Sequence, residues 1–86
     1  MEQIVSRSQN DAIVGEVLPL VLDTAQSILG QPVQPSDNFF DLGGDSTGAV
    51  ELMYTLEVHF GVEFDPASII AADDMVALAT SLNNQL

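Results

Sequence analysis

Apolar residues recur at spacings of three and four through the first third of the chain. The series consists of Val14, Leu18, Val21, Ala25 and Ile28. This spacing brings an apolar side chain to the same face at every turn, which is typical of an amphipathic α-helix. The pattern therefore predicts a first helix that starts near residue 11 and ends before Gly30 and Pro32, since both residues commonly follow a helix C-terminus.

Pro19 interrupts this first helical pattern. A proline inside a helix removes one hydrogen bond and clashes with the carbonyl four residues earlier, here that of Gly15. Either the helix is kinked near Gly15, or its regular part starts late enough to place Pro19 in the first turn. The sequence leaves both alternatives open. Pro19 falls on the polar side with Glu16 and Asp23, so the apolar face is preserved in either case.

A second apolar series predicts a helix from Ser46 to Phe60, ended by Gly61. Its members are Ala49, Val50, Met53, Leu56 and Phe60. On a helix these five positions fall within an arc of about 120°, so we expect them to form a buried stripe.

The predicted loop of residues 30–45 separates these two helices and is long for a compact domain, where loops of this length are often functional. It ends in Gly43 and Gly44, which let the backbone turn without steric penalty. We expect the loop to be attached to the core by Phe39, Phe40 and Leu42.

The last third of the chain predicts two more helices. Asp65 and Pro66 read as a cap followed by proline at the first helical position of a short helix. Asp73 and Asp74 precede a final helix, whose apolar stripe is Met75 or Val76, Leu78, Ala79 and Leu82. No segment has a strand pattern. We therefore predict an all-α fold, a small four-helix bundle with three longer helices and one short helix. Residues 1–10 are expected to be a flexible lead-in and residues 11–86 the domain.

Composition narrows the function classes. The chain of 86 residues has 13 acidic side chains and one basic side chain, Arg7, for a net charge of −12. Such a surface repels nucleic acids and anionic membranes and favours basic patches on protein partners, although the charge could also serve solubility alone. There is no cysteine and a single histidine, His59. No apolar run reaches the roughly 18 residues of a membrane span, so we expect a cytoplasmic protein. We also expect it to be a monomer.

Ser46 is the strongest candidate for chemistry. It follows Gly43, Gly44 and Asp45 at the start of the second predicted helix, where unpaired backbone N–H groups and the helix dipole favour an attached anion. A plain N-cap pair of Asp45 and Ser46 is the simpler structural interpretation. We expect an exposed Ser46 hydroxyl that is suited to carrying a phosphodiester.

The sequence does not fit two other kinds of site. Gly44-Asp45-Ser46-Thr47-Gly48 fits the Gly-x-Ser-x-Gly nucleophile elbow of hydrolases, but that motif needs a preceding strand and a nearby histidine. His59 would lie about 20 Å along the same helix from Ser46. A calcium-binding EF-hand loop counted from Asp37 lacks the required glycine and glutamate positions. The sequence thus predicts no catalytic residues and no metal site.

The segment from Asp37 to Ser46, with Val50-Glu51-Leu52, Leu56-Glu57, Phe60 and Glu63 after it, resembles acyl and peptidyl carrier proteins. The resemblance covers roughly residues 12–84. It implies that Ser46 carries 4′-phosphopantetheine from coenzyme A, attached by a phosphopantetheinyl transferase. Acyl or aminoacyl intermediates would then be held as thioesters and shuttled between enzymes of a polyketide, nonribosomal peptide or fatty acid pathway. The chain departs from the family at Thr47, where a Leu or Ile is usual.

An outward stripe on the second predicted helix is the candidate docking surface. Thr47, Glu51, Tyr54 and Val58 follow spacings of four, three and four away from the predicted buried face, and the resemblance implies that they meet partner enzymes. Asp41 and Asp45 flank the serine and could meet basic residues of the transferase or of loading and processing enzymes. The alternative function is an acidic helical adaptor that binds a basic protein without a prosthetic group.

Overall fold

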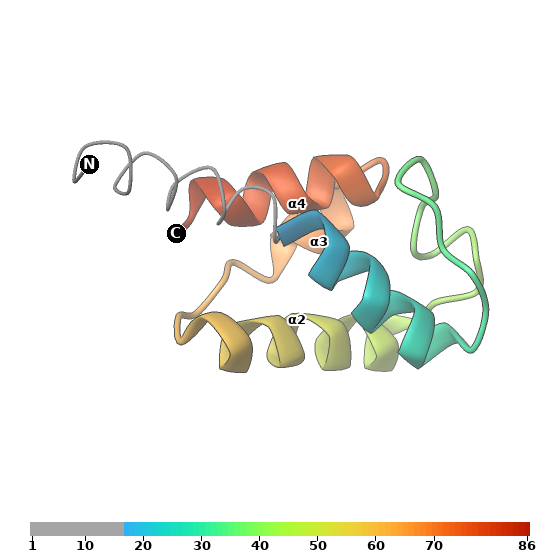
Figure 1. Ribbon diagram of the computed structural model, residues 1–86, viewed down its shortest axis with the longest axis horizontal. Coiled ribbons are helices and arrows are strands. Elements are labelled where there is room, and N and C mark those ends of the chain that lie inside the picture. Colours follow the sequence, from blue (N-terminus) through green and yellow to red (C-terminus); the bar gives the residue numbers. More distant parts are fainter. Residues whose placement is uncertain (1–16) are drawn as a thin grey trace, which may run out of the picture.

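The computed structural model describes residues 17–86, which fold into four helical segments with no strand among them. Helical residues 17–29 are followed by α2 (Ser46–Phe60), α3 (Ala67–Ala71) and α4 (Met75–Asn84). In Figure 1, α2 and α4 run along opposite sides of the view, residues 17–29 cross obliquely between them, and the loop of residues 30–45 closes one end. The predicted bundle of three longer helices and one short helix is confirmed.

Some predictions lie outside the described residues. These are the lead-in over residues 1–10, the start of the first helix, and the choice between a kink near Gly15 and a late start. Pro19 lies within helical residues 17–29 and is exposed, so its ring does not occupy the buried face.

The core brings together side chains from all four helical segments and from the loops. Of the first helix, Val17, Val21 and Ala25 are fully buried, whereas Leu18 and Ile28 are half-buried. The buried stripe therefore includes Val17, whereas the predicted stripe included Leu18 in its place. Both residues fit the spacing of a helix, and only packing against neighbouring elements decides which one is fully buried. In the remaining helices, the residues with 0% exposure are Leu52, Leu56, Leu78 and Leu82.

The predicted stripe on α2 was wrong at Val50. Its side chain is 70% exposed, while Leu52, absent from the prediction, is fully buried. Ala49, Met53 and Leu56 are buried as expected, and Phe60 is half-buried. At about 100° per residue, Val50 lies at one edge of the predicted arc and Leu52 lies just beyond its other edge. The pattern alone could not tell which side of the arc meets the core. The bounds of α2 are as predicted, with Gly61 at φ 71° ending the helix.

The loop of residues 30–45 is attached to the core by its aromatic residues, as predicted. Phe39 is buried, and Phe40 and Leu42 pack half-buried against the core. Backbone bonds also join the loop to the start of α4: Met75 N donates to Asp37 O at 3.0 Å, and Val76 N donates to Pro35 O at 3.2 Å. The loop therefore follows a defined path between the first helix and α2.

The two C-terminal helices agree closely with the sequence. Asp74 is the N-cap of α4, accepting a hydrogen bond from Ala77 N at 2.8 Å. The buried face of α4 consists of Met75, Leu78, Ala79 and Leu82, so Met75 rather than Val76 belongs to the stripe. The prediction that Pro66 is the first residue of α3 was wrong by one position: Pro66 is the N-cap, with φ −59° and ψ −25°, and α3 begins at Ala67. Asp65 Oδ1 accepts a hydrogen bond from Ala67 N at 3.0 Å.

Candidate functional site

Ser46 is the exposed first residue of α2. The residue before it, Asp45, adopts an extended backbone and caps the helix: its Oδ1 accepts from Gly48 N at 2.8 Å. The carbonyl of Asp45 accepts from Ala49 N at 2.8 Å and so begins the helical hydrogen bonds. Because Asp45 supplies the cap, this role does not fall to the Ser46 hydroxyl. The N-cap expectation is confirmed for Asp45, and Ser46 stands at the first helical position.

Two glycines shape the turn before Ser46 in different ways. Gly43 has a φ of 102°, a conformation that side chains disfavour. Gly44 packs against Phe39: an added Cβ would overlap the Phe39 ring and lie 2.7 Å from the Phe39 carbonyl oxygen. The same carbonyl accepts from Gly44 N at 3.0 Å. The chain thus folds back over Phe39 immediately before it enters α2, and this fold sets the position of Ser46.

Gly48 continues the same contact inside the first turn of α2. A Cβ on Gly48 would lie 3.2 Å from Cζ of Phe39 and 3.4 Å from Cγ2 of Ile28. Glycine is a weak helix former, and the residue pattern around Gly48 gives no reason for a glycine in the first turn. The structure supplies one, since the missing side chain lets the first turn of α2 approach Phe39 and the first helix.

Asn38 holds the loop that precedes Ser46 and was missed as a site residue. Its Oδ1 accepts from Phe40 N at 2.8 Å and from Asp41 N at 3.0 Å. Its Nδ2 donates to Asp73 O at 3.1 Å and Ala72 O at 3.4 Å, between α3 and α4. An asparagine that opens a turn is a recognisable sequence signal, but the second pair of bonds spans a sequence distance that no local pattern reveals.

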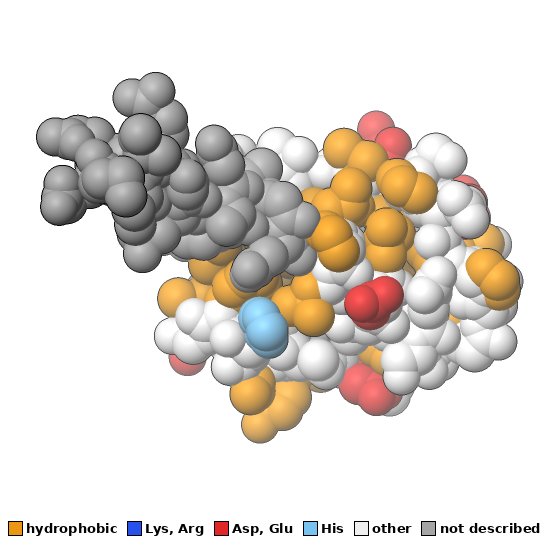
Figure 2. Space-filling view, in the orientation of Figure 1, with side chains coloured by type: hydrophobic (Ala, Val, Ile, Leu, Met, Phe, Trp, Pro, Cys, Tyr) orange, Lys and Arg blue, Asp and Glu red, His pale blue; other side chains and the backbone are white. Residues whose placement is uncertain are grey.

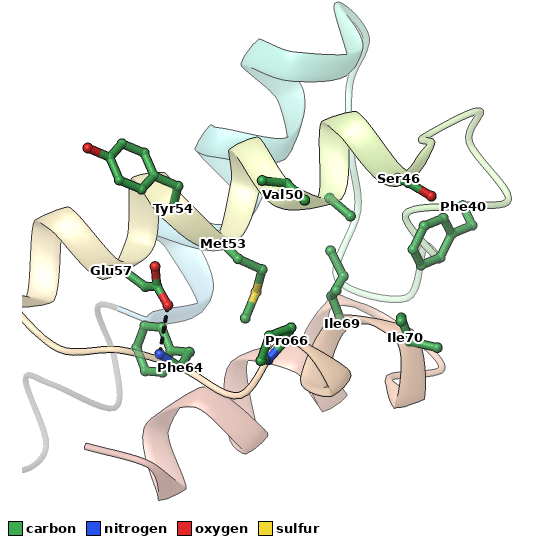
Figure 3. Close-up of a pocket in the computed structure, with 11 residues that line it drawn as sticks. Phe40, Ser46, Val50, Met53, Tyr54, Glu57, Phe64, Pro66, Ile69 and Ile70 are labelled. Carbon is green, nitrogen blue, oxygen red and sulfur yellow. Dashed lines mark hydrogen bonds between the residues drawn. The ribbon is translucent and has the colours of Figure 1, made fainter.

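A groove begins beside Ser46 and runs between α2 and α3, with a volume of about 330 Å³. Figure 3 shows Ile69 of α3 extending toward α2 across it, with Phe40 and Ser46 at one end. The ring hydroxyl of Tyr54 points away from the groove (Figure 3). The residues that line it are Phe40, Ser46, Ala49, Val50, Met53, Tyr54, Glu57, Phe64, Pro66, Ile69 and Ile70.

Glu57 brings a carboxylate to the other end of this mostly apolar groove. Its Oε2 accepts a hydrogen bond from Phe64 N at 2.8 Å (Figure 3). The Glu57 backbone carbonyl accepts from Gly61 N at 2.8 Å and from Val62 N at 3.3 Å. Glu57 therefore fixes both the end of α2 and the segment that leads to α3.

The four residues of the predicted docking stripe are all exposed: Thr47, Glu51, Tyr54 and Val58. Tyr54 is 64% and Val58 63% exposed. Asp41 and Asp45 are exposed on either side of the glycine turn. The structure thus places every predicted docking residue at the surface near or along α2.

Val50 and Ile70 extend this surface and were not predicted to belong to it. Val50 is 70% and Ile70 74% exposed. On the face seen in Figure 2, apolar side chains and a few acidic ones lie among uncharged polar groups and a histidine, and residues 17–86 include no Lys or Arg. Exposed acidic residues (Asp41, Asp45) and exposed apolar residues (Val50, Ile70) therefore both lie on the elements around Ser46.

The surroundings of Ser46 do not form a nucleophile elbow. Residues 30–45 before it contain no strand, and His59 lies exposed in the last turn of the same helix.

Among residues 17–86 no helix combines the length and apolar character needed to cross a bilayer.

Comparisons with known proteins converge on one family. The family described as the phosphopantetheine attachment site matches residues 19–82. Acyl carrier protein 3 of Ralstonia nicotianae is 37% identical over 76 residues, covering 79% of this chain and 87% of that protein. Nonribosomal peptide synthetase 6 of Cochliobolus heterostrophus is 34% identical over 82 residues, covering 87% of this chain. The chain spans only 4% of that synthetase.

A solved structure has the same fold. BlmI, a type-II acyl-carrier-protein from Streptomyces verticillus involved in bleomycin biosynthesis, superposes with a TM-score of 0.74 over 93% of each chain. Its sequence identity to this chain is 17%, so the likeness concerns the fold.

Proposed function

This chain belongs to the phosphopantetheine attachment-site family, which includes acyl carrier proteins and carrier domains of nonribosomal peptide synthetases, and on that premise we propose that Ser46 bears the 4′-phosphopantetheine arm. The family is one of carriers rather than catalysts. The observation that supports Ser46 most directly is its exposure at the first position of α2, after a glycine turn and a cap supplied by another residue.

The residues around Ser46 fit such an arm. The first N–H groups of a helix lack intrahelical acceptors and favour a phosphate at this end. The Asp45 carboxylate is engaged at Oδ1 by the hydrogen bond from Gly48 N. The groove that starts at Ser46 offers an apolar surface to the rest of the arm. When bound, the arm supplies a thiol on which acyl or aminoacyl groups are held as thioesters. Ser46 anchors the arm, and Gly43, Gly44 and Phe39 keep that anchor at the surface.

The carrier would meet its partners through α2 and the adjoining turn. The proposed docking residues are Asp41, Asp45, Thr47, Glu51, Tyr54 and Val58, supported by their exposure on the side of Ser46. Partners would be a phosphopantetheinyl transferase and the enzymes that load and process the cargo of a polyketide, nonribosomal peptide or fatty acid pathway. Their surfaces would combine basic residues, for the acidic groups, with apolar residues for Tyr54 and Val58. We propose that the carrier domain comprises residues 11–86 and acts as a monomer in the cytoplasm.

Intact-mass measurement tests the attachment. The purified protein is incubated with coenzyme A and a promiscuous phosphopantetheinyl transferase. We expect a gain of one phosphopantetheine, which is lost in Ser46→Ala and retained in Ser36→Ala, a control at an exposed serine of the preceding loop. Absence of the gain in the unaltered protein would overturn the proposal and favour the acidic adaptor that binds a basic partner without a prosthetic group.

A further inference from the structure

The groove between α2 and α3 has a polar side chain from α2 at each end, Ser46 and Glu57. At about 100° per residue, their separation is close to three full turns, so both face the same groove. At about 1.5 Å per residue, they are about 16 Å apart along the helix axis. Between them the side chains that line the groove are apolar apart from the Tyr54 hydroxyl, which points away.

This separation matches the reach of the proposed arm. An extended chain advances by about 3.5 Å for every three backbone atoms, and the arm has roughly 14 chain atoms from phosphorus to sulfur, so it spans about 16 Å. An arm that starts at Ser46 and follows the groove therefore brings its thioester to the end where Glu57 lies.

Glu57 is held in place at that end. Its side chain is half-buried, and the hydrogen bond from Phe64 N to Oε2 keeps the carboxylate at the groove rather than in solvent. A carboxylate has lone pairs for further donors besides this one. Residues 17–86 contain no Lys or Arg, so no such side chain of the described protein can neutralise it.

We infer that Glu57 makes the groove selective for cargo with a protonated amine, an aminoacyl thioester, over cargo of the same shape without the amine; this inference rests on the proposed function of Ser46. A charge-assisted hydrogen bond to a carboxylate in a partly water-excluded site is stronger than one in bulk water. A cargo that lacks the amine would cover the Glu57 carboxylate without compensating its lost hydration.

Two arms that differ only in the amine test this inference. The transferase loads the protein with non-hydrolysable coenzyme A analogues carrying a leucyl group or a 4-methylpentanoyl group, its counterpart without the amine. Spectra are recorded at about pH 6.5, below the ordinary pKa of an α-amine. We expect the leucyl form to shift the ¹H–¹⁵N resonance of Phe64 more than the 4-methylpentanoyl form does, and to melt several degrees higher.

Variants assign this difference to Glu57. Glu57→Gln keeps an acceptor for Phe64 N but removes the charge, and we expect it to abolish the difference between the two cargoes. Glu63→Gln makes the same change at an exposed neighbouring position and should leave the difference intact. Equal responses to the two cargoes in the unaltered protein, or a difference that survives in Glu57→Gln, would overturn the inference alone. Failure to load either analogue, seen by mass, would overturn the proposed function and the inference with it.

Discussion

The Phe39 ring occupies the space that a side chain at Gly44 would need. An added Cβ would overlap the ring and lie 2.7 Å from the Phe39 carbonyl oxygen, which also accepts a hydrogen bond from Gly44 N. Phe39 is 2% exposed and contacts the core, so it cannot move aside without opening a void. The direction in which the chain enters α2, and hence the position of Ser46, follows from this contact.

We expect Gly44→Ala to lower the free energy of unfolding by about 1–3 kcal/mol, the usual cost of overpacking, and to slow the loading of Ser46. Chemical denaturation and the rate of mass gain would measure the two effects. Gly30→Ala is the control: Gly30 has a φ of 68° but open space around it, so only a backbone cost of about 1 kcal/mol applies. A Gly44→Ala variant as stable and as readily loaded as the unaltered protein would contradict the assigned role of Phe39.

Asp45 combines two roles that substitutions can separate. Asp45→Ala removes the cap on Gly48 N and should cost about 1 kcal/mol of stability. Asp45→Asn retains a side-chain oxygen for the cap, so its thermal stability should stay close to that of the unaltered protein. If Asp45 also meets basic residues of the transferase, Asp45→Asn will raise the KM for loading; an unchanged KM would limit Asp45 to capping.

Asn38→Ala removes the side-chain bonds that join the loop to the α3–α4 junction. We expect a loss of about 1–3 kcal/mol in stability, since backbone partners lose their hydrogen bonds, and faster amide exchange at Phe40 and Asp41. Asn84→Ala, at an exposed position near the end of α4, should leave both measurements unchanged. Equal amide exchange in the two variants would show that the loop is held by its apolar contacts alone.

Glu51→Lys tests the docking surface. Glu51 is exposed in the middle of α2, so its substitution should preserve helicity while slowing loading by the transferase and turnover by partner enzymes. Glu63→Lys makes the same charge change outside the docking stripe and should have a smaller effect. Circular dichroism checks the fold and mass spectrometry the rate. Unaltered kinetics for Glu51→Lys would remove this part of α2 from the interface.

Added salt should raise the melting temperature at neutral pH. The net charge of −12 opposes the compact state through self-repulsion, which salt screens over about 10 Å at 0.1 M. Scanning calorimetry across a series of sodium chloride concentrations measures the effect, and divalent cations should act at lower concentrations. A melting temperature independent of salt would mean that the acidic groups are too widely spread to oppose folding.

Much of the helix placement could be predicted because caps and breakers act within a few residues. Gly61 ends α2 through its own positive φ, and Asp74 begins α4 by binding a backbone N–H in the first turn. The exposed position of Ser46 could be predicted for the same reason, from its place at the start of a helix after two glycines. These features depend on backbone geometry that neighbouring residues determine, whatever the rest of the chain does.

Only the tertiary structure decided what depends on contacts between distant residues. A helical pattern alone places Val50 and Leu52 equally well in the core, and only the folded core buries Leu52 completely while leaving Val50 70% exposed. The groove exists because α3 lies opposite α2, and Asn38 reaches Asp73 only in the folded chain. Sequence periodicity identifies apolar faces, but the neighbour that covers each face is selected by packing across the whole domain.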